Sequence, residues 1–219
     1  PSLQKKIFLR YLDSVESITL RDVFDSYMTS YFGAWVNYQN SYGQNKYITA
    51  FTARLAMDKV NVDSFFEVYP DGRLISIIRD PKNWFPSALR HNEYIKRDKY
   101  TDMNLALSQW RESALTTLRN KETYGDNVCI IRFEDLIGKT EEVMRHLSNF
   151  LDIEFDDTLL TPTFNGFPIK ANTSFESEQH GIMRSTLSRQ KTLSDEDVKT
   201  IDTLTSNEYE MVLNQAATF

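Results

Sequence analysis

The stretch R-L-I-S-I-I-R-D-P-K-N-W-F-P-S-A-L-R-H at residues 73–91 says most about how this chain folds. Its apolar run at 74–78 is rich in β-branched residues and short enough for a buried strand. Arg79 follows at the end of that strand, and the Asp-Pro step after it disfavours simple continuation. We expect Asn83 to cap a helix over 84–96, because its side-chain oxygen can accept a hydrogen bond from a free backbone N–H.

Two side chains near this strand end suit an anion. Arg79 carries a fixed positive charge, and Ser87, expected in the first turn of the helix, carries a hydroxyl. The carboxyl end of a strand in a parallel sheet is where ligands bind in open α/β folds, and a helix N-terminus favours negative charge. The arginine, the serine and the helix N-terminus together predict a phosphate site. The alternative is a buried strand followed by a capped surface helix without a ligand.

The same stretch resembles the R-N-P-x-D-x-x-x-S signature of the sulfotransferase family, whose members use 3′-phosphoadenosine 5′-phosphosulfate (PAPS). Arg79, Pro81 and Ser87 match it, and the resemblance implies that Arg79 and Ser87 hold the 3′-phosphate. Two positions depart from the signature. Asp80 replaces the family's asparagine and puts a carboxylate near the anion site. Asn83 replaces its aspartate, which is a mild change because both residues are good helix caps.

A second apolar run, at 127–133, carries a further part of the resemblance. It leads into the triplet E-D-L at 134–136, then into a helix expected at 140–151, and later into the proline-led loop at 162–166. This order also resembles the sulfotransferase family, particularly its bacterial members. The resemblance therefore covers about residues 70–190, most of the chain.

The acids and the G-K-T segment that follow this run have simpler interpretations than catalysis or nucleotide binding. Glu134 and Asp135 are expected to fix the turn or to pair with arginines such as Arg132. A Walker sequence needs a glycine five residues before its second glycine, and Phe133 occupies that place. We expect Thr140 to cap the next helix instead.

Strands that alternate with helices indicate an α/β protein with a parallel sheet. We expect 74–78 and 128–132 to be neighbouring parallel strands buried on both faces, and a third strand at 47–51. The resemblance implies a P-loop-NTPase-like three-layer sandwich, with a central parallel sheet and helices on both faces. Residues 1–219 would form a single sulfotransferase-like domain that is incomplete at its N-terminus.

Further helices follow from apolar residues at helical spacing and from end signals. Thr19 and Ser194 are expected to cap two of them, and Gly125 to end a third. The aromatic stripe of the second helix is expected to lie in the core. The helices are expected at 2–12, 20–35, 58–68, 103–123 and 194–214.

Composition limits the partners and the location. The 219 residues carry a net charge of −6 at pH 7, which disfavours broad nucleic-acid binding, and no apolar run is long enough to span a membrane. The single cysteine, Cys129, lies in an apolar run and is expected to be a buried thiol. With no disulfide framework and no signal-peptide pattern, we expect a cytoplasmic protein. No histidines stand at metal-ligand spacing, so no metal is expected.

A sulfotransferase also needs a site for the 5′-phosphosulfate, which the family forms with a strand and a Ser/Thr- and Gly-containing loop near its N-terminus. The sequence contains no such segment, and it begins with Pro1. We expect the chain to be the C-terminal part of a longer one, whose activity needs a segment upstream of residue 1. The segment at 49–54, where the resemblance places a general base, has no acid or histidine. His91, one turn after Ser87, is the nearest histidine, and a solvated helix residue is the alternative.

In the family a late basic loop closes over the cofactor, which implies that Arg189 contributes to the 3′-phosphate site, with Arg184 and Lys191 as alternatives. The implied function is transfer of a sulfuryl group from PAPS to a hydroxyl or amine of a small-molecule or carbohydrate acceptor. A non-catalytic relative, used for nucleotide binding or as an interaction domain, is the alternative. A P-loop kinase relative is disfavoured, because no Walker sequence is present. The sequence predicts no oligomeric state.

Overall fold

The computed structural model describes residues 2–36, 47–52, 55–95, 102–164, 167–169 and 181–219. They fall into two compact units, Pro1–Gly72 and Arg73–Phe219. The assignment of the whole chain to one sulfotransferase-like domain stays a prediction. Within the described residues, no helix combines the length and the apolar character needed to cross a membrane.

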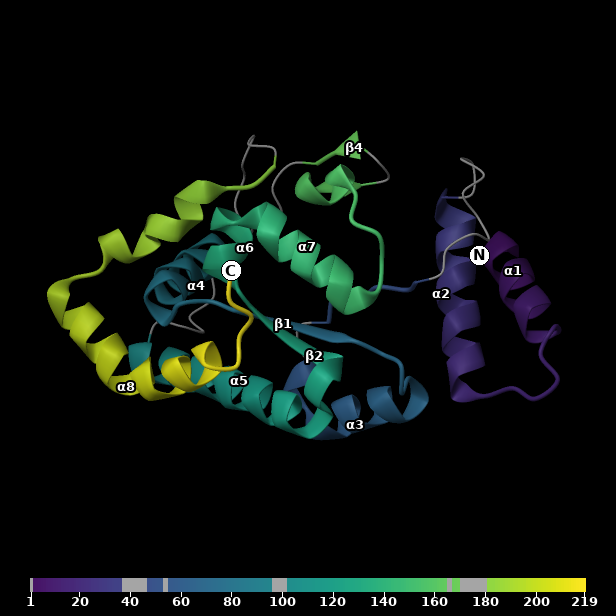
Figure 1. Ribbon diagram of the computed structural model, residues 1–219, viewed down its shortest axis with the longest axis horizontal. Helices are drawn as coiled ribbons and strands as arrows, with labels where there is room; N and C mark the ends of the chain where they lie inside the picture. The colour runs from purple at the N-terminus through teal and green to yellow at the C-terminus, as the bar shows by residue number, and fades with distance from the viewer. Residues whose placement is uncertain (1, 37–46, 53–54, 96–101, 165–166, 170–180) are drawn as a thin grey trace. The chain divides into compact units, whose positions relative to one another are not determined.

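The first unit contains α1 (Ser2–Leu12), α2 (Leu20–Val36), η2 (Leu55–Met57) and α3 (Lys59–Val68). The helices α1 and α2 pack against each other as a pair (Figure 1). The predicted cap at Thr19 is confirmed, because Asp22 N donates to Thr19 Oγ1 at 3.2 Å and Thr19 N donates to the Asp22 carboxylate at 2.9 Å. The described residues 47–52 form no strand, so the predicted strand at 47–51 is wrong.

The aromatic stripe of α2 does not form the core that the sequence predicted. Leu20 and Tyr27 are 75% and 50% exposed. Over residues 20–34 of this helix, where burial is described, the buried residues are Ser26, Ser30 and Gly33, which recur at helical spacing. The Ser30 hydroxyl is satisfied locally, because it donates to Tyr27 O at 2.7 Å. The buried face of this helix therefore includes small residues, while several members of the aromatic stripe are exposed.

The second unit is built on two parallel strands, β1 (Leu74–Ile78) and β2 (Val128–Arg132), paired in register from Leu74 with Val128 to Ile78 with Arg132. The chain passes between them through α4 (Pro81–Ile95), α5 (Met103–Tyr124) and η3 (Gly125–Asn127). Gly125, with φ of 51°, ends α5 as predicted. The prediction that these two apolar runs are parallel neighbours is confirmed. The prediction that both are buried on both faces holds for residues 128–131 of β2 but is wrong for β1, where Ile77 is 54% exposed.

Helices cover both faces of this sheet. On one face, Ile130 packs with Trp110 of α5 and Val212 of α8 (Asp195–Leu213). On the other face, Ile131 packs with Val143 of α7 (Thr140–Leu151). The described residues therefore show a helix-rich α/β fold layered around a two-stranded parallel sheet, while the wider P-loop-NTPase-like sandwich stays a prediction.

The remaining elements follow β2 (Figure 1). Ser194 caps α8 in a capping box with Asp197, as predicted. Thr140 is not a cap, because it lies inside α7 and its hydroxyl donates to Leu136 O at 2.8 Å. The elements not yet named are α6 (Phe133–Gly138), η4 (Asp157–Leu160), β3 (Thr163–Phe164), antiparallel to β4 (Phe167–Pro168), and η5 (Arg184–Thr192).

Candidate functional site

The helix α4 begins earlier than the sequence predicted. The Asp80 carboxylate accepts from Lys82 N at 2.8 Å, and the Asp80 carbonyl accepts from Trp84 N at 2.8 Å. Asp80 is thus the residue that caps α4, and Pro81 takes the first helical position, where a missing N–H costs nothing. The predicted cap at Asn83 is wrong.

Because α4 begins earlier, Ser87 lies further along the helix than predicted. The predicted position of Ser87 in the first turn is wrong, because the residue lies in the second turn of α4, after Pro86. The first-turn N–H groups of Lys82 and Trp84 are already bound by Asp80. The expected contribution of a free helix N-terminus is therefore not present, and the site depends on side chains.

Arg79 stands at the end of β1 and is held on several sides. Its backbone oxygen accepts from Trp110 Nε1 at 3.1 Å, which fixes the strand end against the core. Its Nη2 donates to Thr186 O of η5 at 2.9 Å, and its guanidinium lies 4.6 Å from the centre of the Phe133 ring. The Arg79 Nε is buried and has no hydrogen-bond partner among the described residues.

Ser87 meets the third predicted residue directly. Arg189 Nη1 donates to Ser87 Oγ at 3.0 Å. The segment that carries Arg189 is η5, which packs beside α4 (Figure 1). Of the basic residues in this segment, Arg184 and Lys191 are exposed. The structure thus brings Arg79 and Ser87, which are close in sequence, together with the distant Arg189.

The two arginines are close enough to oppose each other's charge. Burial lowers the pKa of Arg79 first, and the charge of Arg189 lowers it further, while Glu134 and Asp80 act in the opposite direction. Burial likewise lowers the pKa of Arg189, and the nearby Arg90 adds to this. An anion bound between these guanidiniums would relieve both the desolvation and the repulsion, so the electrostatics suit a phosphate.

Glu134 links the carboxyl ends of the two strands. Its Oε1 accepts from Asp80 N at 3.2 Å, and burial raises the pKa of its carboxyl group. Asp135 lies 3.6 Å from the Arg132 guanidinium and 3.7 Å from Lys139 Nζ. The prediction that these acids fix the strand and loop geometry is confirmed. The contact between 80 and 134 was not predicted, although acids after adjacent parallel strands must come close.

The remaining predictions for the site concern a general base and a metal. The Nδ1 of His91 is buried and without a hydrogen-bond partner in the described part of the chain, and its role as a base stays a prediction. The resemblance places a general base in the segment at 49–54, and residues 53–54 of that segment lie outside the described residues.

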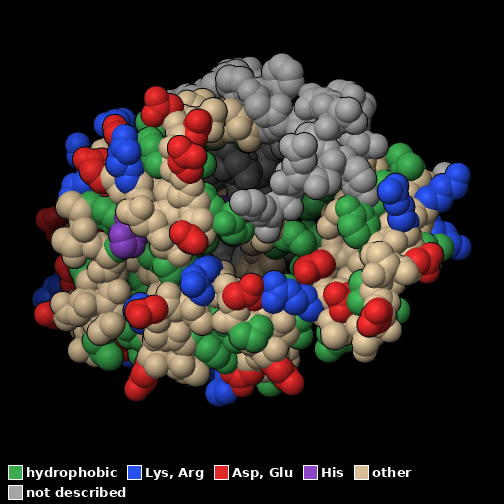
Figure 2. All heavy atoms as spheres, turned by 45° about the vertical axis from the view of Figure 1, so that its right-hand side comes forward, with side chains coloured by type: hydrophobic (Ala, Val, Ile, Leu, Met, Phe, Trp, Pro, Cys, Tyr) green, Lys and Arg blue, Asp and Glu red, His purple; other side chains and the backbone are tan. Residues whose placement is uncertain are grey.

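Across the described ranges, no three His, Cys, Asp or Glu side chains gather as a metal site would require. On the face shown in Figure 2, acidic and basic side chains are interspersed.

Residues 10–157 match the Sulfotransferase family. The chain belongs to this family. Two solved structures are similar in fold. One is the sulfotransferase domain from the curacin biosynthetic pathway, with 17% identity, a TM-score of 0.57 and coverage of 93% of this chain and 78% of that one. The other is the sulfotransferase domain from the olefin synthase of Synechococcus PCC 7002, with 18% identity, a TM-score of 0.58 and coverage of 99% and 75%.

A curated relative is the protein-tyrosine sulfotransferase A of Caenorhabditis elegans, which is 25% identical over 95 residues. This match spans 43% of the chain and about a quarter of the relative's length, 25%. Family and fold thus support a transferase of the sulfotransferase type.

Proposed function

We propose that this chain is the 3′-phosphate-binding part of a PAPS-dependent sulfotransferase. The enzyme would move a sulfuryl group from PAPS to a hydroxyl or amine and release 3′-phosphoadenosine 5′-phosphate. The observation that carries this proposal is the hydrogen bond of 3.0 Å between Arg189 and Ser87, close to the partly buried guanidinium of Arg79. Two partly buried cations that repel each other are costly without an anion, and the family uses such an anion.

Each of these residues has a distinct part in binding. The guanidiniums of Arg79 and Arg189 offer planar pairs of donors that match phosphate oxygens. Ser87 Oγ accepts from Arg189 and keeps its own hydroxyl proton for a phosphate oxygen. The bond from Arg79 to Thr186 O ties η5 to the strand end, so the two arginines are held in place before the nucleotide arrives. Such preorganisation orients the nucleotide for in-line transfer.

Arg79, Ser87 and Arg189 do not supply the donors that the reaction needs at the 5′-phosphosulfate. Charge moves at the 5′-phosphosulfate, and donors aimed there provide most of the acceleration. We found no loop of that kind in the sequence, so we expect residues 1–219 alone to transfer sulfate very slowly or not at all. Labelled-sulfate transfer from PAPS to a panel of sugars, phenols, amines and a tyrosine peptide tests this. Robust turnover by the 219-residue chain would contradict it.

The acceptor and the compartment belong to the same proposal. A small-molecule or carbohydrate acceptor is proposed, and the name of the curated relative adds a tyrosyl hydroxyl to the panel. A single buried cysteine, Cys129, suits a reducing compartment, which favours the cytoplasm.

Calorimetry tests the proposed function by comparing adenosine 3′,5′-bisphosphate (3′,5′-ADP) with adenosine 5′-monophosphate (5′-AMP). The two ligands differ only in the 3′-phosphate. We expect 3′,5′-ADP to bind at least about tenfold more tightly, the effect of one charge-assisted hydrogen bond. Equal affinities would overturn the proposal, because nothing in the protein would then read the 3′-phosphate.

A non-catalytic relative is the second candidate function. It is favoured by the absence of a strand in the described residues 47–52, near where the family carries its base, and by the lack of an acid or histidine at 49–54. Such a protein would still prefer 3′,5′-ADP over 5′-AMP. It would show no transfer even in a longer chain that carries the 5′-phosphosulfate loop, which distinguishes the two candidates.

A further inference from the structure

Asn83 has a contact that its position in α4 does not require. The residue is only 4% exposed, and its Oδ1 accepts from the backbone N–H of Gln190 at 3.2 Å. The neighbouring residue, Arg189, donates to Ser87 at 3.0 Å. Asn83 and Ser87 are four residues apart on one helix and therefore share a face. One face of α4 thus holds two consecutive residues of η5, one through its backbone and one through its side chain.

The segment η5 does not fix the orientation of these two residues by itself. Ser188, which directly precedes Arg189, has a φ of −115° and interrupts the helical backbone. A long arginine side chain loses much rotamer freedom when it is held in one place. A backbone attachment at Gln190 reduces that loss, because it places the Arg189 Cα before the side chain makes its own contact.

We propose that Asn83 is a positioning residue for the 3′-phosphate site, which docks η5 on α4 so that the Arg189 guanidinium stands beside Ser87. This inference rests on the proposed function of that site. A further link runs from η5 to the strand end through Arg79, which also belongs to the proposed phosphate site. Asn83 supplies an attachment that involves no side chain assigned to phosphate binding.

The experiment compares variants of the full 219-residue chain by calorimetry with 3′,5′-ADP and 5′-AMP. Asn83→Ala removes the acceptor, and we expect it to weaken 3′,5′-ADP binding about threefold to tenfold, the usual effect of one neutral hydrogen bond, with 5′-AMP unchanged. Asn83→Asp keeps an acceptor oxygen, so its loss should stay below about threefold. Gln190→Ala is the matched control, because it keeps the backbone N–H, and it should bind both nucleotides as the wild type does.

A double-mutant cycle separates positioning from a general structural role. In the Arg189→Ala background, Asn83→Ala should change the ratio of the two affinities no further, because the side chain that it positions is gone. If circular dichroism shows that Asn83→Ala is unfolded, Asn83→Ser replaces it, since a serine hydroxyl is too short to reach the Gln190 N–H and the same loss is expected.

The outcomes that overturn the inference differ from those that overturn the proposed function. If the wild-type chain binds the two nucleotides equally, the 3′-phosphate site itself is wrong. If the wild type discriminates and Asn83→Ala, or Asn83→Ser in its place, discriminates as well as the wild type, the role of Asn83 is wrong. A loss in Asn83→Asp as large as in Asn83→Ala, or an additive loss in the double variant, would also overturn it.

Discussion

Replacing Arg79 tests the candidate site at the end of β1. Arg79→Ala removes the charge, the bond to Thr186 O and the contact with the Phe133 ring. The loss of a hydrogen bond to a charged group is about 1.5–3 kcal/mol. Asp80 and Glu134 lie near enough to offset part of the arginine's charge. We therefore expect the lower part of that range, about 1.5–2 kcal/mol, or roughly a 10- to 30-fold weaker affinity for 3′,5′-ADP.

The conservative variant Arg79→Lys sharpens the test. A lysine keeps the charge but offers its donors from a single point, so it cannot bind Thr186 O and two phosphate oxygens as a guanidinium can. We expect it to lose roughly tenfold in affinity for 3′,5′-ADP. Chemical denaturation should show a change of less than about 1.5 kcal/mol in the free energy of unfolding for either variant, because the lost contacts are offset by relief of repulsion from Arg189.

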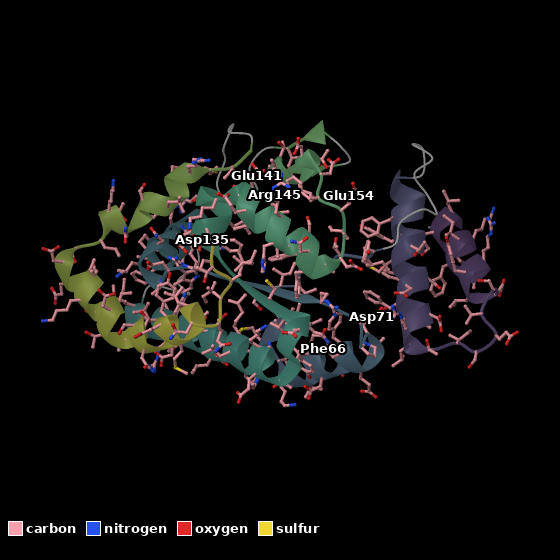
Figure 3. The ribbon with its side chains drawn as sticks, viewed as in Figure 1. Phe66, Asp71, Asp135, Glu141, Arg145 and Glu154 are labelled. Atoms are coloured by element: carbon pink, nitrogen blue, oxygen red, sulfur yellow. The ribbon has the colours of Figure 1, made fainter. Side chains whose placement is uncertain are left out.

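The matched control is Arg145→Ala on α7 (Figure 3). Arg145 is also an arginine over an aromatic ring, 3.9 Å from the centre of Phe155, and it donates to Glu141 at 2.8 Å. The control should leave both nucleotide affinities unchanged. The reasoning would be refuted if Arg79→Ala weakened 5′-AMP as much as 3′,5′-ADP, or if it left both unchanged.

Three further predictions concern pH, capping and the cysteine. Burial raises the pKa of Glu134 in the folded protein, so this group's stabilising effect is complete below its unfolded pKa of about 4.3 and is lost as the pH rises through the folded value. The melting temperature of Glu134→Gln should therefore rise relative to wild type between pH 4 and pH 7.5, and a pH-independent difference would argue against this. Ser194→Ala breaks the capping box of α8 and should lower the free energy of unfolding in urea by about 1 kcal/mol, while a change near zero would mean that the cap is not used. Cys129 is 5% exposed and burial raises the pKa of its thiol, so iodoacetamide at pH 8 should modify the native protein far more slowly than the urea-unfolded chain, and equal rates would contradict its burial.

The sheet and most helices could be predicted because their signals are local. The apolar runs at 74–78 and 128–132 predicted two parallel neighbours under helices, and the pairing is as expected, although Ile77 of β1 is 54% exposed. The start of α4 was missed although the sequence contained the signal, since an aspartate followed by proline is a cap followed by a first helical residue. The stripe of α2 was misjudged because periodicity identifies a helix but does not say which face packs, and small residues such as Ser30 form the buried face.

The candidate site was predictable only in part. Arg79 and Ser87 stand close in sequence and could be named from residue types, whereas Arg189 was named only through the family resemblance. The bond from Gln190 to Asn83 joins residues far apart in sequence and uses a backbone donor, so no pattern of side chains in the sequence predicts it. The contact of Glu134 with Asp80 was also not predictable from a local pattern, because it depends on the register of two strands rather than on either strand alone.

A crystal structure of the chain with bound 3′,5′-ADP tests the central claim most directly. We predict that the 3′-phosphate lies within hydrogen-bonding distance, about 2.7–3.2 Å, of the guanidiniums of Arg79 and Arg189 and of Ser87 Oγ. The bond between Arg189 and Ser87 would then lengthen or be shared with the phosphate. A nucleotide whose 3′-phosphate contacts none of these three residues would contradict the account.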